Sequence, residues 1–123
     1  MKFIMRLYRR HDMDLLLLHK TKGFSMQKAV KAALYMHLGL VDEGSIPYPT
    51  VGEPLDKFFS SSQLHLTLSE DNDMDMAVIK FIKDIPKGYR NSYCKNIVRY
   101  YLERPKQFMY SNNKIFFGKG ENK

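Results

Sequence analysis

A short pattern of residues occurs twice in this chain. An alternating segment that contains Phe3 is followed by an Asp-Met-Asp triplet at 12–14, and a similar segment that contains Leu64 is followed by the same triplet at 73–75. Phe3 and Leu64 are 61 positions apart, and the two triplets share this spacing. Each copy predicts one strand and two helices, which is too little to enclose a core alone. We therefore expect the two copies to complete one another.

The two alternating segments predict strands at residues 2–8 and 63–69. Apolar and polar residues alternate with a period of two, which indicates one face for the core and one face outward. The outward positions are the candidate binding residues of the strands: Lys2, Ile4, Arg6, Gln63, His65 and Thr67.

Helical spacing of apolar residues follows each strand. The first copy predicts helices at 11–22 and 26–38, and the second copy predicts them up to about Asp84 and about Leu102. Cys94 lies on the apolar stripe of the last helix and is expected to be buried. The expected N-caps are Asp12 and Ser25 in the first copy, and Ser69 or Asp71 and Asn91 or Ser92 in the second.

Composition divides the chain into four segments of one composite domain. The repeats cover 1–38 and 63–104, an acidic linker with Pro and Gly covers 39–62, and a basic aromatic tail covers 105–123. The net charge is +7, and the first 39 residues carry eight Lys or Arg against two Asp. Clustered cations attract phosphates over a long range, so a polyanion is the expected partner.

Several classes of protein are disfavoured by the sequence. The longest fully apolar run, Leu15 to Leu18, is far too short to cross a membrane, and no signal peptide is apparent. Cys94 is the one cysteine, so we expect a reducing cytoplasmic location. The four histidines lack metal-ligand spacing, and the triplets lack a His or Ser partner for catalysis. We expect no enzyme activity, no metal and no cofactor.

The segments 2–7 and 23–34, repeated as 64–68 and 87–92, resemble the ribbon-helix-helix superfamily of the Arc, MetJ and CopG type. Two copies in one chain are similar to tandem proteins of the TraY type, which assist conjugative relaxases. The resemblance implies a mostly α fold with a two-stranded antiparallel β-ribbon. It also implies two tandem ribbon-helix-helix repeats that form an intramolecular pseudo-dimer.

The same resemblance implies a sequence-specific protein for double-stranded DNA, with the ribbon in the major groove. Arg6 would recognise guanine and Gln63 adenine, Ile4 and Thr67 would contact thymine methyl groups, and His65 would donate or accept a hydrogen bond. Because the strands differ, the site would be asymmetric. The second helices would hold flanking phosphates through Lys22, Ser25, Met26, Lys87, Arg90, Asn91 and Ser92.

The biological role stays open at this level. A transcriptional repressor and an accessory of plasmid partition or conjugation both fit, with or without further self-association on adjacent sites. The alternative is a protein-interaction module, such as an antitoxin whose tail at 105–123 binds its partner.

Overall fold

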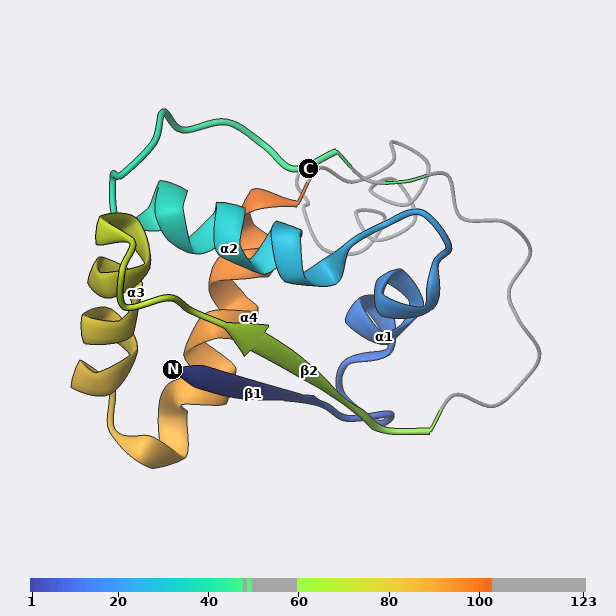
Figure 1. Ribbon diagram of the computed structural model, residues 1–123. Coiled ribbons are helices and arrows are strands. Elements are labelled where there is room, and N and C mark those ends of the chain that lie inside the picture. The colour runs from blue at the N-terminus through green and yellow to red at the C-terminus, as the bar shows by residue number, and fades with distance from the viewer. Residues whose placement is uncertain (48, 50–59, 103–123) are drawn as a thin grey trace, which may run out of the picture.

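The computed structural model describes residues 1–47, 49 and 60–102 of the chain (Figure 1). Over these residues the fold is mostly α with one two-stranded antiparallel ribbon, as expected. Most of the expected linker and the whole tail at 105–123 lie outside the described residues. The elements, in order, are β1 (Lys2–Leu7), α1 (Met13–Lys20), α2 (Met26–His37), β2 (Ser62–Thr67), α3 (Asp73–Asp84), the 3₁₀ turn η1 (Lys87–Tyr89) and α4 (Arg90–Tyr101).

The ribbon joins segments that lie far apart in the sequence. β1 pairs antiparallel with β2, and Ile4 faces His65 at the middle of the ladder. β2 ends two residues earlier than the predicted 63–69, because the Ser69 amide donates to the Asp75 carboxylate at 2.9 Å. β1 ends at Leu7 for the same reason, since the Tyr8 amide donates to Asp12 at 2.7 Å.

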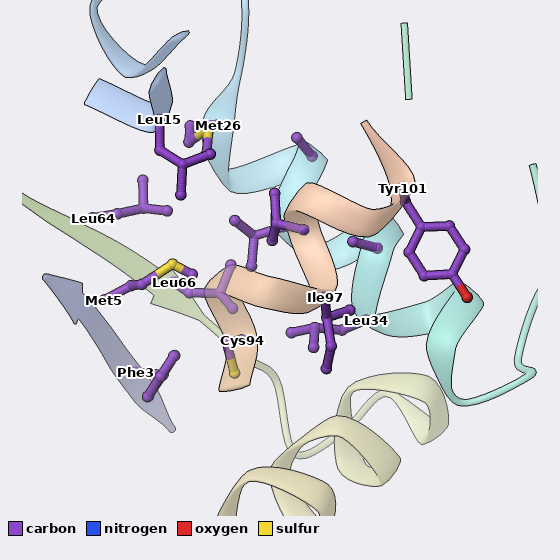
Figure 2. Packing of buried hydrophobic residues seen from close by; sticks show 14 of the residues in the cluster. Phe3, Met5, Leu15, Met26, Leu34, Leu64, Leu66, Cys94, Ile97 and Tyr101 are labelled. Carbon is purple, nitrogen blue, oxygen red and sulfur yellow. The ribbon is translucent and has the colours of Figure 1, made fainter. Parts of the chain in front are cut away.

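The inward face of the ribbon covers a single apolar core. β1 packs against α4 and β2 against α2, so each strand lies on the second helix of the other copy, and α2 packs against α4. Cys94 is fully buried as predicted, and burial raises the pKa of its thiol to about 12. The core residues labelled in Figure 2 are Phe3, Met5, Leu15, Met26, Leu34, Leu64, Leu66, Cys94, Ile97 and Tyr101.

The ends of α2 follow local sequence signals. Ser25 is the N-cap, as predicted, and its hydroxyl accepts a hydrogen bond from the Lys28 amide at 3.3 Å. After the helix, Gly39 has a φ of 71°, and the Leu40 amide returns to the Tyr35 carbonyl at 2.9 Å. This is a Schellman ending, in which glycine takes the left-handed position without a Cβ penalty.

Asp12 occupies the N-cap position of α1, as predicted, but its side chain makes no cap hydrogen bond, because its carboxylate is directed at other partners described below. The two predicted N-caps of the second copy are wrong. α3 begins after Asn72, whose side chain accepts from the Met74 and Asp75 amides, and not after Ser69 or Asp71. α4 begins at Arg90, directly after η1, so that Asn91 and Ser92 lie within its first turn.

Replacing the cap of α3 tests its energetic weight. We expect Asn72→Ala to lower the free energy of unfolding by about 1 kcal/mol, because two first-turn amides lose their acceptor. Thermal denaturation should show a midpoint roughly 4 °C lower. Ser92→Ala is the matched control and should leave the midpoint unchanged, since Ser92 is exposed and caps no helix.

Candidate nucleic-acid interface

The outer face of the ribbon brings together all six strand residues predicted from the sequence. They are exposed, while the residues between them are buried. The register pairs them across the strands as Lys2 with Thr67, Ile4 with His65, and Arg6 with Gln63. Six residues in each strand give a face about 20 Å long.

The register matches the spacing of the repeat. His65 lies 61 positions after Ile4, the offset of the two copies, and these two residues face one another. The middle of the ribbon is therefore also the point about which the two strands correspond. Positions that are equivalent in the two copies lie at equal distances from it, on opposite sides. Met5 and Leu64 have no exposed surface, so slipping either strand by one residue would turn the buried residues of that strand toward water. The core thus fixes which side chains point outward.

The N-terminus of α2 lies beside two exposed polar residues of the predicted phosphate set, Lys22 and Ser25. The Met26 side chain is buried, so only its backbone amide is available at this end. The first amides of an α-helix lack intrahelical acceptors and carry partial positive charge. No acidic residue lies in the first turn of α2, so this end is suited to an anion.

The N-terminal region of α4 makes side-chain hydrogen bonds to two other elements, β1 and the end of α3. Asn91 bonds both ways to the backbone of Arg6, accepting from its amide at 3.0 Å and donating to its carbonyl at 3.3 Å. The Arg90 guanidinium donates to the carbonyls of Ile85 and Lys83, at the end of α3, at 2.8 and 3.1 Å. Asn91 thereby fixes α4 to the outer edge of β1.

The remaining predicted residues at this end are the exposed Lys87 in η1 and the exposed Ser92 in α4. The first turn of α4, like that of α2, contains no acidic residue. The bonds of Arg90 and Asn91 were missed by sequence reasoning, because they join residues that only the tertiary fold brings together.

A further basic group lies where β1 ends. Arg9, Arg10 and His11 line a pocket of 580 Å³, and the Arg9 amide donates to the Ser61 hydroxyl at 2.9 Å. Three consecutive basic residues at 9–11 could have been recognised in the sequence as a further candidate for phosphate contact, but they were not predicted as one. They extend the positive surface beyond the ribbon.

A buried ion-pair network joins the start of α1 to α4. The Asp12 carboxylate accepts from Lys95 at 2.7 Å and from Arg99 at 3.0 Å, in addition to the Tyr8 amide. Arg99 also forks onto Asp14, at 2.8 and 2.9 Å. Burial alone would raise the pKa of Asp12, but the hydrogen bonds from Lys95, Tyr8 and Arg99 outweigh it and lower that pKa. Asp12 is therefore a charged group that links the end of β1 and the start of α1 to α4.

A second network joins the start of α3 to α2 in the same way. The Asp75 carboxylate accepts from Lys31 at 3.1 Å, from the Tyr35 hydroxyl and from the Ser69 amide. Burial opposes ionisation of Asp75, yet the bonds from Tyr35, Ser69 and Lys31 lower its pKa. Burial and the bond to Asp75 together raise the pKa of Tyr35 to about 12.

The two networks correspond in the spacing of their helix residues. Lys31 and Lys95 are 64 positions apart, as are Tyr35 and Arg99. The aspartates differ, since Asp12 is the first residue of its triplet and Asp75 is the last residue of the other. In each network an aspartate near the start of a first helix binds the second helix of the other copy and an amide just beyond its own strand. The Asp-Met-Asp triplets and the repeated lysine were the available signals, but the sequence predicted only an N-cap role for Asp12 and no role for Asp75.

Other kinds of site are not found in the part of the chain that the structure describes. Within 1–47, 49 and 60–102 there is no group of three or more His, Cys, Asp or Glu that could hold a metal ion. No helix among these residues has the length and apolar character needed to span a bilayer. Comparisons with protein-family models, curated proteins and solved structures find no match to this chain.

Proposed function

We propose that this chain is a sequence-specific protein for double-stranded DNA that places its β-ribbon in the major groove. The observation that carries the proposal is the outer face of the ribbon, where six exposed residues form three cross-strand pairs. Five of these side chains, all except Ile4, have hydrogen-bond donors or acceptors that can distinguish base pairs in the major groove. A two-stranded ribbon fits a groove about 12 Å wide.

We further propose that the chain works as an intramolecular pseudo-dimer of two ribbon-helix-helix repeats. The similar lysine–aspartate contacts at the starts of α1 and α3, and the agreement between register and repeat spacing, support this arrangement. The outward residues of the two strands differ, so the preferred DNA site is asymmetric. The cellular role is that of a repressor or of an accessory in plasmid partition or conjugation, in the cytoplasm, where the lone thiol of Cys94 stays reduced.

Phosphates next to the ribbon would be held at the two second helices. At α2, Lys22, Ser25 and the Met26 amide offer donors at a positive helix end. At α4, Lys87 and Ser92 are the exposed donors, while Arg90 and Asn91 contribute chiefly by fixing the position of the helix. Such contacts set the orientation of the protein on DNA, and the ribbon reads the sequence.

Selection of bound duplexes from a random pool tests the proposal directly. We expect enrichment of one asymmetric consensus, and a mass measurement of the complex should show one chain for each such site. A strictly palindromic consensus bound by two chains would contradict the intramolecular arrangement. A lack of any enrichment, with only salt-sensitive binding to all duplexes, would contradict sequence-specific recognition.

The variant Arg6→Ala separates recognition from general attraction to DNA. We expect a loss of about 1–3 kcal/mol of discrimination at one base step, because a forked contact with guanine is removed. Binding to each single-base variant of the selected site measures this loss. Lys22→Ala is the control: it should weaken binding to all sequences about equally and make the salt dependence shallower. Unchanged discrimination in Arg6→Ala would contradict the assignment of the reading face.

A further inference from the structure

A pocket lined with tyrosines runs along α4, from Tyr93 in its first turn to Tyr101 at its last residue. Its volume is 430 Å³, and Tyr93, Tyr100, Tyr101 and His37 contribute rings to its lining. The rings of Tyr100 and Tyr101 stand at 85° to one another, with centroids 4.9 Å apart. Tyr100 is 75% exposed and Tyr93 is 52% exposed, so two of these rings offer aromatic surface to a partner.

The pocket shares no lining residue with the proposed DNA-binding face. Along α4 it extends from Tyr93, two residues after the ribbon contact Asn91, to Tyr101, which lies about 15 Å from Asn91 along the helix axis. The Ile46 amide donates to the Tyr101 carbonyl at 2.8 Å and so brings the 41–47 segment to this end of the helix. This contact places Glu43 in the lining of the pocket.

The charge of the pocket is opposite to that of the chain as a whole. The chain has a net charge of +7, but among the residues that the structure describes the pocket is lined by the carboxylate of Glu43 and by no Lys or Arg. Burial, followed by the charge of Glu43 and a hydrogen bond to it, raises the pKa of Tyr101. An acidic group among aromatic faces attracts a cation and repels phosphate.

We propose that this pocket binds an arginine side chain of a partner polypeptide. A guanidinium stacks on aromatic faces, is only weakly hydrated, and can donate to the carboxylate of Glu43 at the same time. Tyrosine and arginine are enriched in protein interfaces, which favours a polypeptide as the source of the cation.

Peptide titration in the absence of DNA tests this inference independently of the proposed function. The probe is an acetylated, amidated Gly-Gly-Arg-Gly-Gly peptide, added to the full chain while the tyrosine ring resonances are followed by NMR. We expect saturable shifts for Tyr93, Tyr100 and Tyr101. The same peptide with citrulline in place of arginine has no positive charge and should give at least tenfold weaker binding.

Variants of exposed residues sharpen the test. We expect Tyr100→Leu to weaken binding about fivefold, while Tyr100→Phe retains it, because the ring supplies the attraction. Tyr89→Leu is the matched control, since Tyr89 is exposed but does not line the pocket. Equal binding of the citrulline peptide, or an unchanged affinity in Tyr100→Leu, would overturn the inference. So would ring shifts caused by a thymidine decamer and not by the arginine peptide, which would indicate stacking of nucleic-acid bases.

Discussion

Replacing Asp12 by asparagine is expected to lower the free energy of unfolding by about 3–5 kcal/mol. The Asp12 side chain is 3% exposed and the Lys95 side chain 8% exposed, so the substitution leaves a buried ammonium without its carboxylate. Arg99 loses its bond to Asp12 but keeps Asp14, in the first turn of α1. Domains of this kind are stable by about 5–15 kcal/mol, so a large share of the total would be lost. Chemical denaturation with a fitted midpoint and slope measures the difference.

The best control for this variant is the equivalent substitution in the second triplet. Asp73 occupies the repeat position of Asp12 but is exposed, so Asp73→Asn should change stability by less than about 0.5 kcal/mol. In the pair Asp12→Asn and Lys95→Met, the double variant should lose less than the sum of the two single losses, because each single variant already removes the same buried ion pair. Strict additivity would contradict the importance of the buried pair.

The same network predicts how stability depends on pH. The folded-state pKa of Asp12 lies below its unfolded value of about 3.9, so its contribution is complete above that value. The contribution is lost as the pH falls through the lower, folded-state pKa. Asp12→Asn should therefore lose stability less steeply than the natural chain between about pH 5 and the acid limit. An equal slope in both proteins would show that Asp12 does not carry the acid sensitivity.

Local sequence patterns were sufficient to predict much of the fold. The alternation at 2–7 and 63–67 identified the buried and exposed faces of the ribbon, because side chains in a strand alternate between its two faces. Ser25 was identified as a cap because only the next few residues decide that bond. The buried position of Cys94 also followed from helical spacing.

The contacts that depend on distant residues were not predicted. Asp12 has the local pattern of an N-cap, yet Lys95 and Arg99 approach from 83 and 87 residues away and take its carboxylate. Asn91 likewise resembles a cap, but it binds the edge of β1. In both cases tertiary partners compete with the local bond for the same polar atoms, and no pattern within one helix reveals the competitor.

Making the outer face of the ribbon symmetric is expected to convert the asymmetric DNA consensus into a palindrome. The triple variant Gln63→Lys, His65→Ile and Thr67→Arg gives β2 the same outward order as β1. All three positions are exposed and the inward residues are unchanged, so the register should persist. Like charges would then face across the strands at two of the three pairs, with a cost of about 0.2–1 kcal/mol at each. Selection from a random duplex pool, with the natural chain in parallel, measures the change.

The reciprocal triple variant tests which strand recognises which half of the DNA site. Lys2→Gln, Ile4→His and Arg6→Thr give β1 the outward order of β2, and should select a different palindrome. Each palindrome should repeat one half of the asymmetric consensus, because each strand would read its own half in the natural chain. If both variants still selected the natural consensus, base recognition would lie outside the ribbon. If both lost all preference while remaining folded, the two strands would not act as independent reading units, and recognition would depend on cross-strand pairs such as Ile4 and His65.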